Sequence, residues 1–142
     1  MKIEDIMTRD VRTCVASDSL ATAAQIMWEI DCGAVPVLDS EDRVVGIITD
    51  RDIAIRGVGE GCAPDARVRD IMSSEVKYCY ADEETGEVLD NMAQIQVRRL
   101  PVVDQDKRLV GIVSIGDLAK EEQSASGEAL SDIARPSALH SQ

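Results

Sequence analysis

The chain has 142 residues, 44% of them apolar, which is enough for one compact domain or for two small domains that share a core. A formal charge of −12 and an aromatic content of 2% argue against nucleic acid and anionic membranes as partners, because such binding needs clustered cations or stacking platforms. No apolar run approaches the ~20 residues that cross a bilayer, and the N-terminus has no signal-type apolar region, so we expect a cytoplasmic protein.

The sequence contains the same unit twice. Asp5-Ile6-Met7 returns 65 positions later as Asp70-Ile71-Met72, and this register holds without a gap as far as the pair Asp52 and Asp117. Units of this length usually cannot each bury their own apolar sheet face. We therefore expect the copies to pack on each other about a pseudo-twofold axis, with two equivalent clefts where they meet.

The first copy reads as strand, helix, strand, strand and helix. Strand formers at 11–15 are followed by a helix that begins near Ser17-Asp18-Ser19 and places its apolar residues on one face. Two strands, 34–38 and 44–48, are joined by a short polar turn and predict an antiparallel hairpin. The short helix that follows, from 50 to 56, should end at Gly57.

The second copy follows the same order. Its strands are expected at 76–80, 100–103 and 109–113, with a helix around 88–95 and a short one from about 115 to 121. We place the first repeat with its linker at 1–64, the second repeat at 65–122 and a tail at 123–142. In that tail, an apolar stripe predicts a possible short helix from Gly127 to Arg135.

Each hairpin has a proline in its first strand, Pro36 in one copy and Pro101 in the other. Proline has no backbone N–H to donate to a ladder of hydrogen bonds. This strand is therefore expected to lie at a sheet edge or to begin irregularly.

The four cysteines show no C-x-x-C spacing, and the single His140 is far from all of them in the sequence, so no metal site is predicted. Cys14 and Cys79 occupy the same position of the two repeats, between residues typical of strands. We expect them to be small buried apolar side chains. A redox or metal role stays open as a third reading, and it would need two cysteines to be close in space.

One motif recurs where chemistry is expected. Gly46-Ile47-Ile48-Thr49-Asp50-Arg51-Asp52 is matched by Gly111-Ile112-Val113-Ser114-Ile115-Gly116-Asp117, and each places a hydroxyl residue and an aspartate at the start of a helix. A capping box would explain either copy alone. The alternative is ligand binding, in which free backbone N–H groups at the helix start attract a phosphate and the aspartate accepts hydrogen bonds from a ribose.

A basic pair supports the ligand-binding interpretation. Arg98-Arg99 precede the second proline, whereas the equivalent positions in the first copy are Gly33-Ala34. If the copies face each other, two guanidiniums meet two small residues, which leaves room for an anion. Solvated arginines at a strand edge are the equally open alternative.

Together these motifs resemble the CBS domain, and two in tandem resemble a CBS pair, also called a Bateman module. The resemblance extends from Lys2 to about Glu122. It implies an α+β fold of two βαββα repeats packed through their sheets. It also implies that an adenosine-containing ligand (AMP, ADP, ATP, S-adenosylmethionine or NAD) sits in the cleft between the repeats.

The resemblance also assigns roles to residues. Asp52 and Asp117 are expected to hold ribose hydroxyls, and Thr49 and Ser114 to contact ribose or phosphate. Arg98 and Arg99 resemble the basic residues that hold phosphates in nucleotide-binding members. The remaining expected contacts are Met7, Arg12, Gly33, Ala34 and Ile112 for the Ser114 site, and Met72, Lys77 and Ile47 for the Thr49 site.

The function expected from the sequence is therefore regulatory. A free-standing pair of this kind would sense an adenosine nucleotide, without a required cofactor, and signal to a protein on another chain. Members of the family commonly form homodimers through their helices, and Leu118 and Ala119 offer apolar surface for this. A ligand-free structural or interaction protein remains the main alternative, and an enzyme is the class least supported, because no residues have nucleophile-and-base spacing.

Overall fold

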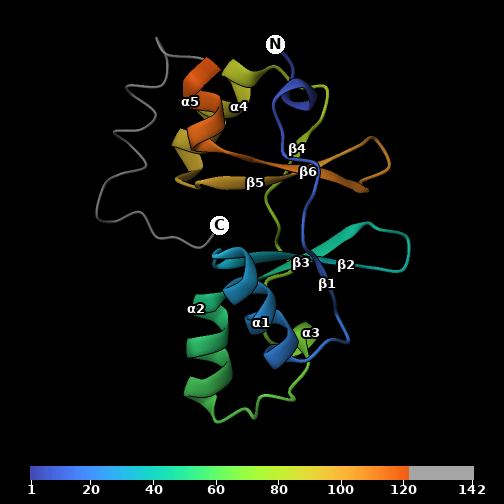
Figure 1. Cartoon of the computed structure of the whole chain (residues 1–142), viewed down its shortest axis with the longest axis vertical. Helices are drawn as coiled ribbons and strands as arrows, with labels where there is room; N and C mark the ends of the chain where they lie inside the picture. The colour runs from blue at the N-terminus through green and yellow to red at the C-terminus, as the bar shows by residue number, and fades with distance from the viewer. Residues whose placement is uncertain (122–142) are drawn as a thin grey trace. The chain divides into compact units, whose positions relative to one another are not determined.

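The computed structural model describes residues 1–121, and this part of the chain divides into two compact units (Figure 1). Arg12–Val76 form one unit, which we call the middle unit. Met1–Val11 and residues 77–121 form the other, which we call the split unit because its two segments are far apart in the sequence. The helix expected at 127–135 lies outside the described residues.

The middle unit contains a three-stranded sheet in the order β1-β2-β3. β1 is parallel to β2, and β2 is antiparallel to β3. Its elements in chain order are β1 (Cys14–Val15), α1 (Leu20–Ile30), β2 (Ala34–Leu38), β3 (Val44–Thr49), α2 (Asp50–Asp52), the π-helix η2 (Ile53–Gly57), the 3-10 helix η3 (Val58–Glu60) and α3 (Val68–Ile71).

The split unit repeats this arrangement, with the sheet order β4-β5-β6. Its elements are the 3-10 helix η1 (Ile3–Asp5), β4 (Cys79–Tyr80), α4 (Thr85–Ile95), β5 (Arg99–Val103), β6 (Leu109–Ser114) and α5 (Ile115–Glu121). Each unit thus has a small mixed sheet with helices, and the predicted α+β class is confirmed. The strands β1 and β4 are shorter than expected, because only two residues of each pair with the neighbouring strand.

Helix α1 begins as the sequence predicts. Ser19 is its N-cap, and the Ser19 hydroxyl accepts a hydrogen bond of 3.1 Å from the backbone N–H of Thr22. Leu20, Ala23 and Met27 are buried on the inner face, while Ile30 at the end of the helix is exposed. The cap and the apolar face together explain why this segment is helical.

The helical segment that follows β3 in the middle unit extends beyond its predicted end. Gly57 is buried within it, and a side chain there would meet Leu20, because a Cβ would lie 3.1 Å from Leu20 Cδ1. The turn continues to Glu60 and ends at Gly61, whose φ of 82° is in the left-handed region that glycine favours. Gly57 therefore serves close packing, and Gly61 ends the helix.

The predicted edge position of the proline-containing strands is wrong, since β2 and β5 are the central strands of their sheets. Pro36 pairs with Ile47, which directs both of its backbone hydrogen bonds to Ser73 and needs no donor from β2. On the other side, β1 pairs with β2 only from Val37 onward. This irregular start of the pairing lets proline occupy a central strand.

Each unit includes one Asp-Ile-Met segment. Residues 5–7 come before the middle unit in the sequence but belong to the split unit, and residues 70–72 belong to the middle unit. Thr8 exchanges two backbone hydrogen bonds of 2.9 Å with Ile112 of β6, and Ser73 does the same with Ile47 of β3. The backbones approach closely because the adjacent position is glycine: at Gly111 a Cβ would lie 2.8 Å from the carbonyl oxygen of Thr8. The compact units therefore change over after Val11 and after Val76.

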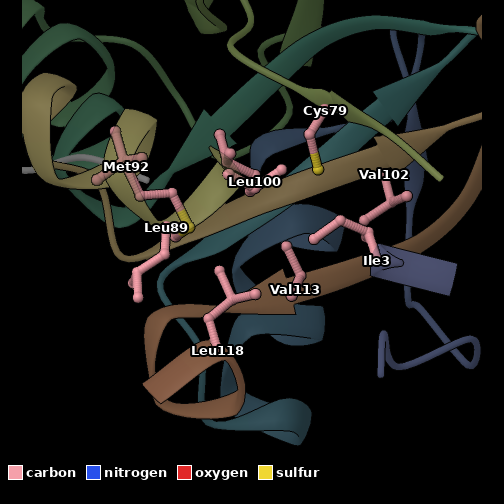
Figure 2. Packing of buried hydrophobic residues seen from close by; sticks show 10 residues of the cluster. Ile3, Cys79, Leu89, Met92, Leu100, Val102, Val113 and Leu118 are labelled. Carbon is pink, nitrogen blue, oxygen red and sulfur yellow. The ribbon is translucent and has the colours of Figure 1, made fainter. Parts of the chain in front are cut away.

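The core of the split unit is completed by the N-terminal segment. Figure 2 shows Ile3 pointing toward Val102 and Val113 of the sheet, in the same cluster as Leu89 of α4 and Leu118 of α5. Ile3 is 0% exposed, and Val68 is equally buried at the equivalent position of the middle unit. Burial of Ile3 thus joins residues 1–11 to a sheet formed near the other end of the described chain.

We predict that Ile3→Ala destabilises the split unit by about 2–5 kcal/mol, because it removes a fully buried side chain and leaves a cavity. Urea unfolding should show a lower midpoint, and amide hydrogen exchange should accelerate in 79–118 before it does in 14–57. Glu4→Ala, on the exposed side of the same segment, is the matched control. Equal midpoints for the two variants would show that residues 1–11 are not part of this core.

Candidate functional site

The Thr49 motif lies where β3 ends and α2 begins. The Thr49 hydroxyl accepts a 3.0 Å hydrogen bond from the backbone N–H of Asp52, and Asp52 Oδ2 accepts one of 3.0 Å from the backbone N–H of Thr49. The two residues thus form a capping box, with Thr49 only 2% exposed. One oxygen of the Asp52 carboxylate is therefore used in holding the helix start.

The Ser114 motif has the same geometry at the junction of β6 and α5. The Ser114 hydroxyl accepts a 3.1 Å bond from the backbone N–H of Asp117, and Asp117 Oδ2 lies 3.4 Å from the backbone nitrogen of Ser114, which donates to it. The capping interpretation is therefore satisfied in both copies. Ligand binding must therefore use groups that take no part in the two capping boxes.

The expected convergence of free backbone N–H groups is not found at the start of α2. The N–H of Asp50 donates to the carbonyl oxygen of Gly33 at 2.8 Å, and that of Arg51 donates to Asp50 Oδ1 at 2.8 Å. The prediction was wrong here because the acidic side chain of Asp50 itself supplies an acceptor.

The two aspartates differ in their second oxygen. Asp52 Oδ1 forms an ion pair with Arg56 Nη2 at 3.3 Å, and the same Arg56 nitrogen donates to the carbonyl oxygen of Ile71. Within residues 1–121, Asp117 Oδ1 meets no hydrogen-bond donor and no cation. The position equivalent to Arg56 holds Glu121, which has the opposite charge.

Arg98 and Arg99 lie beside the Ser114 motif of their own unit. Arg99 is directly opposite Ser114 in the pairing of β5 with β6, and the carbonyl oxygen of Arg98 accepts a 2.9 Å bond from the N–H of Ile115. Both arginines are exposed, and neither forms an ion pair with any residue from 1 to 121. The equivalent residues of the middle unit are Gly33 and Ala34, with Ala34 opposite Thr49.

Apolar members of the predicted site lie near the motif of their own unit. Met72 is close to Gly46 of β3, the strand that contains Ile47, and Met7 is close to Gly111 of β6, the strand that contains Ile112.

Three predicted contacts of the Ser114 site, Arg12, Gly33 and Ala34, belong to the middle unit. Lys77, predicted for the Thr49 site, belongs to the split unit. Arg12 is exposed and forms an ion pair of 2.8 Å with Glu29.

Sequence reasoning missed Arg56. It is the residue that closes the Asp52 carboxylate, and it stands four positions after that aspartate, a spacing that brings opposite charges together on a helical segment. The i,i+4 pattern was visible in the sequence. The pattern indicates a difference between the two motifs only when Arg56 is compared with Glu121, the acidic residue at the equivalent position of the other repeat.

The cysteines are all free. Burial raises the pKa of Cys14 from 9.0 to about 12, with a smaller contribution from Asp18, and burial with a smaller contribution from Glu83 does the same for Cys79. In the part of the chain that the structure describes, no group of three or more His, Cys, Asp or Glu side chains could hold a metal ion. His140 lies outside that part.

Between residues 1 and 121, no helix has both the length and the apolar character needed to cross a bilayer.

Comparison with known proteins identifies the family. The model of the CBS domain matches residues 3–58 and 68–124. The chain belongs to the CBS domain family. Protein YlbB of Bacillus subtilis is 40% identical over 135 residues, which are 93% of this chain and 90% of that protein.

Solved structures of CBS proteins match the fold. Hypoxic Response Protein I with two coordinated zinc ions is 38% identical, with a TM-score of 0.76 over 85% of this chain and 98% of that one. The CBS domain pair of protein MJ0100, in complex with 5′-methylthioadenosine and S-adenosyl-L-methionine, is 27% identical, with a TM-score of 0.73 over 87% of this chain and 95% of that one. The fold of the two units is thus that of a CBS pair.

We predict that two of the four thiols react rapidly with a disulfide reagent at pH 8. Cys32 and Cys62 are partly exposed, whereas Cys14 and Cys79 are buried and remain protonated, and the thiolate is the reactive form. All four should react after unfolding in urea. In Cys32→Ser/Cys62→Ser the rapid phase should disappear, and its persistence would contradict the burial of the other two.

The raised pKa values also predict a pH dependence of stability. In the unfolded chain Cys14 and Cys79 lose their protons near pH 9.0, but in the folded chain only near 12, so above pH 9 the unfolded state binds fewer protons. The free energy of unfolding should therefore fall between pH 9 and 12. Cys14→Ala/Cys79→Ala should reduce the slope in urea unfolding measured across this range, and an unchanged slope would contradict the assignment.

Proposed function

We propose that this CBS pair binds an adenosine-containing nucleotide of the AMP, ADP or ATP class and signals its presence to another protein. The observation that carries the proposal is the set of unpaired groups at the Ser114 motif. Within the described residues, Asp117 keeps one carboxylate oxygen without a partner, and two exposed arginines lie at the adjoining strand start.

These groups match the parts of a nucleotide. A carboxylate oxygen accepts hydrogen bonds from ribose hydroxyls, and a guanidinium binds phosphate oxygens through two parallel N–H donors. Ile112 and Met7 would supply apolar contact for the adenine.

The choice among adenosine compounds follows from charge. The MJ0100 pair is described with S-adenosyl-L-methionine and 5′-methylthioadenosine, neither of which has a phosphate. In this chain Arg98 and Arg99 would be left without an anion by such a ligand, so a phosphorylated one is favoured. S-adenosylmethionine and NAD remain the alternatives that a titration should include.

The regulatory step requires that the nucleotide prefer one conformation of the protein over another. We propose that this preference changes the surface offered to a partner protein, in the cytoplasm and from a homodimer. The proposal includes no catalytic step and no required cofactor.

A second candidate function is a ligand-free interaction protein. It is favoured by the two complete capping boxes, which explain the hydroxyl residue and the aspartate of each motif without any ligand. Under this hypothesis Arg98 and Arg99 are solvated surface residues.

We predict that AMP or ATP binds with measurable heat in isothermal titration and that Asp117→Asn weakens binding at least tenfold, about 1.4 kcal/mol. The side-chain oxygen of asparagine can still accept the N–H of Ser114, so the loss would reflect the missing carboxylate and not unfolding. Asp90→Asn, on the exposed side of α4, is the matched control and should bind normally.

The second candidate makes the opposite prediction. If AMP, ADP, ATP, S-adenosylmethionine and NAD all fail to bind and leave the melting temperature unchanged, the sensor function is rejected and the interaction function is retained.

A further inference from the structure

The two motifs occupy equivalent positions, yet they carry different charges at the place where a phosphate would sit. In the split unit, Arg98 begins the segment that passes beside the start of α5, and its carbonyl oxygen holds the N–H of Ile115. In the middle unit the same hydrogen bond joins Gly33 to Asp50. Arg98 of the split unit thus corresponds to Gly33 of the middle unit, and Ile115 corresponds to Asp50.

The side chain of Asp50 occupies the space above Gly33. A Cβ added to Gly33 would lie 2.5 Å from Asp50 Oδ2 and 2.9 Å from Oδ1, closer than carbon and oxygen can approach. A carboxylate therefore lies beside the position that is equivalent to Arg98 of the split unit. Asp50 is exposed and its side chain can move, but its charge would neutralise a cation placed there and repels a phosphate.

In the middle unit, Arg56 occupies the oxygen of the Asp52 carboxylate that the capping box does not use. Its guanidinium pairs with Asp52 Oδ1 while donating to the carbonyl oxygen of Ile71, so this side chain is held from two directions. With Asp52 Oδ2 used in the capping box, both oxygens of the carboxylate have partners. A ribose would have to displace Arg56 to reach the carboxylate.

The arrangement of the charges differs between the motifs, although their sum does not. In the middle unit Asp50 and Asp52 are balanced by Arg51 and Arg56, and in the split unit Arg98 and Arg99 are balanced by Asp117 and Glu121. Beside the start of the helix, the split unit has the two arginines, whereas the middle unit has the carboxylate of Asp50. A phosphate is therefore favoured beside the helix start of the split unit.

We propose that the two motifs have diverged into one open and one closed site, so that the chain binds one phosphorylated adenosine ligand, at Ser114, Asp117, Arg98 and Arg99. The Thr49 motif is closed by Asp50 and Arg56 and keeps a structural role as a helix cap. This inference rests on the proposed function and narrows it to one site of defined ligand charge.

Titration calorimetry with AMP tests the stoichiometry. We expect about one AMP per chain and at least a tenfold loss of affinity in Arg98→Ala/Arg99→Ala, about 1.4 kcal/mol. Arg69→Ala removes an exposed arginine of α3 and is the matched control. Because both arginines are exposed, the double variant should unfold in urea at the wild-type midpoint; if it does not, Arg98→Gln/Arg99→Gln takes its place.

A second variant tests the closure directly. Gly33→Arg/Asp50→Ile gives the middle unit the residues of the split unit at these two positions, and it should bind a second AMP per chain. Gly33→Arg alone should not, because the Asp50 carboxylate beside position 33 would pair with the new guanidinium and neutralise it. A stoichiometry that stays at one in the double variant would show that these residues do not close the motif.

The outcomes separate the two proposals. Absence of binding by every adenosine compound would reject the proposed function. Two AMP molecules bound per wild-type chain, or an unweakened affinity in Arg98→Ala/Arg99→Ala, would overturn the single-site inference and leave the nucleotide-binding function standing.

Discussion

In each compact unit one short backbone pairing joins the Asp-Ile-Met segment to the sheet. Thr8 binds Ile112 in the split unit and Ser73 binds Ile47 in the middle unit, in each case through a reciprocal pair of hydrogen bonds beside a glycine. These pairings place an Asp-Ile-Met segment against the last strand of the sheet. The glycine of the Gly-Ile motif thus has a structural reason, since a side chain there would collide with the segment.

The motif next to this pairing combines two uses of the same residues. Each hydroxyl and aspartate form a capping box, which requires one carboxylate oxygen and leaves the other. In the middle unit Arg56 takes the second oxygen, and in the split unit nothing within residues 1–121 does. The same aspartate can therefore serve both a helix cap and a ligand site. The residues around it decide whether its second carboxylate oxygen is available to a ligand.

The order of elements could be predicted because it is encoded locally. Apolar periodicity and the cap at Ser19 define α1, and the short polar turn defines the hairpin of β2 and β3. Which sheet each Asp-Ile-Met segment joins could not be predicted, because both copies carry nearly the same residues and only tertiary pairing distinguishes the partners. The central position of Pro36 depends on hydrogen bonds between Ile47 and Ser73, which no local pattern shows. At the motif, the residue types were identified correctly as a possible cap, and the i,i+4 spacing of Asp52 and Arg56 was visible, but which oxygen of the carboxylate Arg56 takes depends on side-chain geometry in the folded protein.

The division of the chain into a continuous middle unit and a split unit has a consequence for biosynthesis. All the strands of the middle unit, and the segment that closes its sheet, leave the ribosome as one uninterrupted stretch. Ile3 and Thr8 emerge before the middle unit, yet their partners Val113 and Ile112 are made near the end of the described chain. The middle unit can thus complete its core during translation. The side chain of Ile3 stays unburied until the sheet β4-β5-β6 has been synthesised.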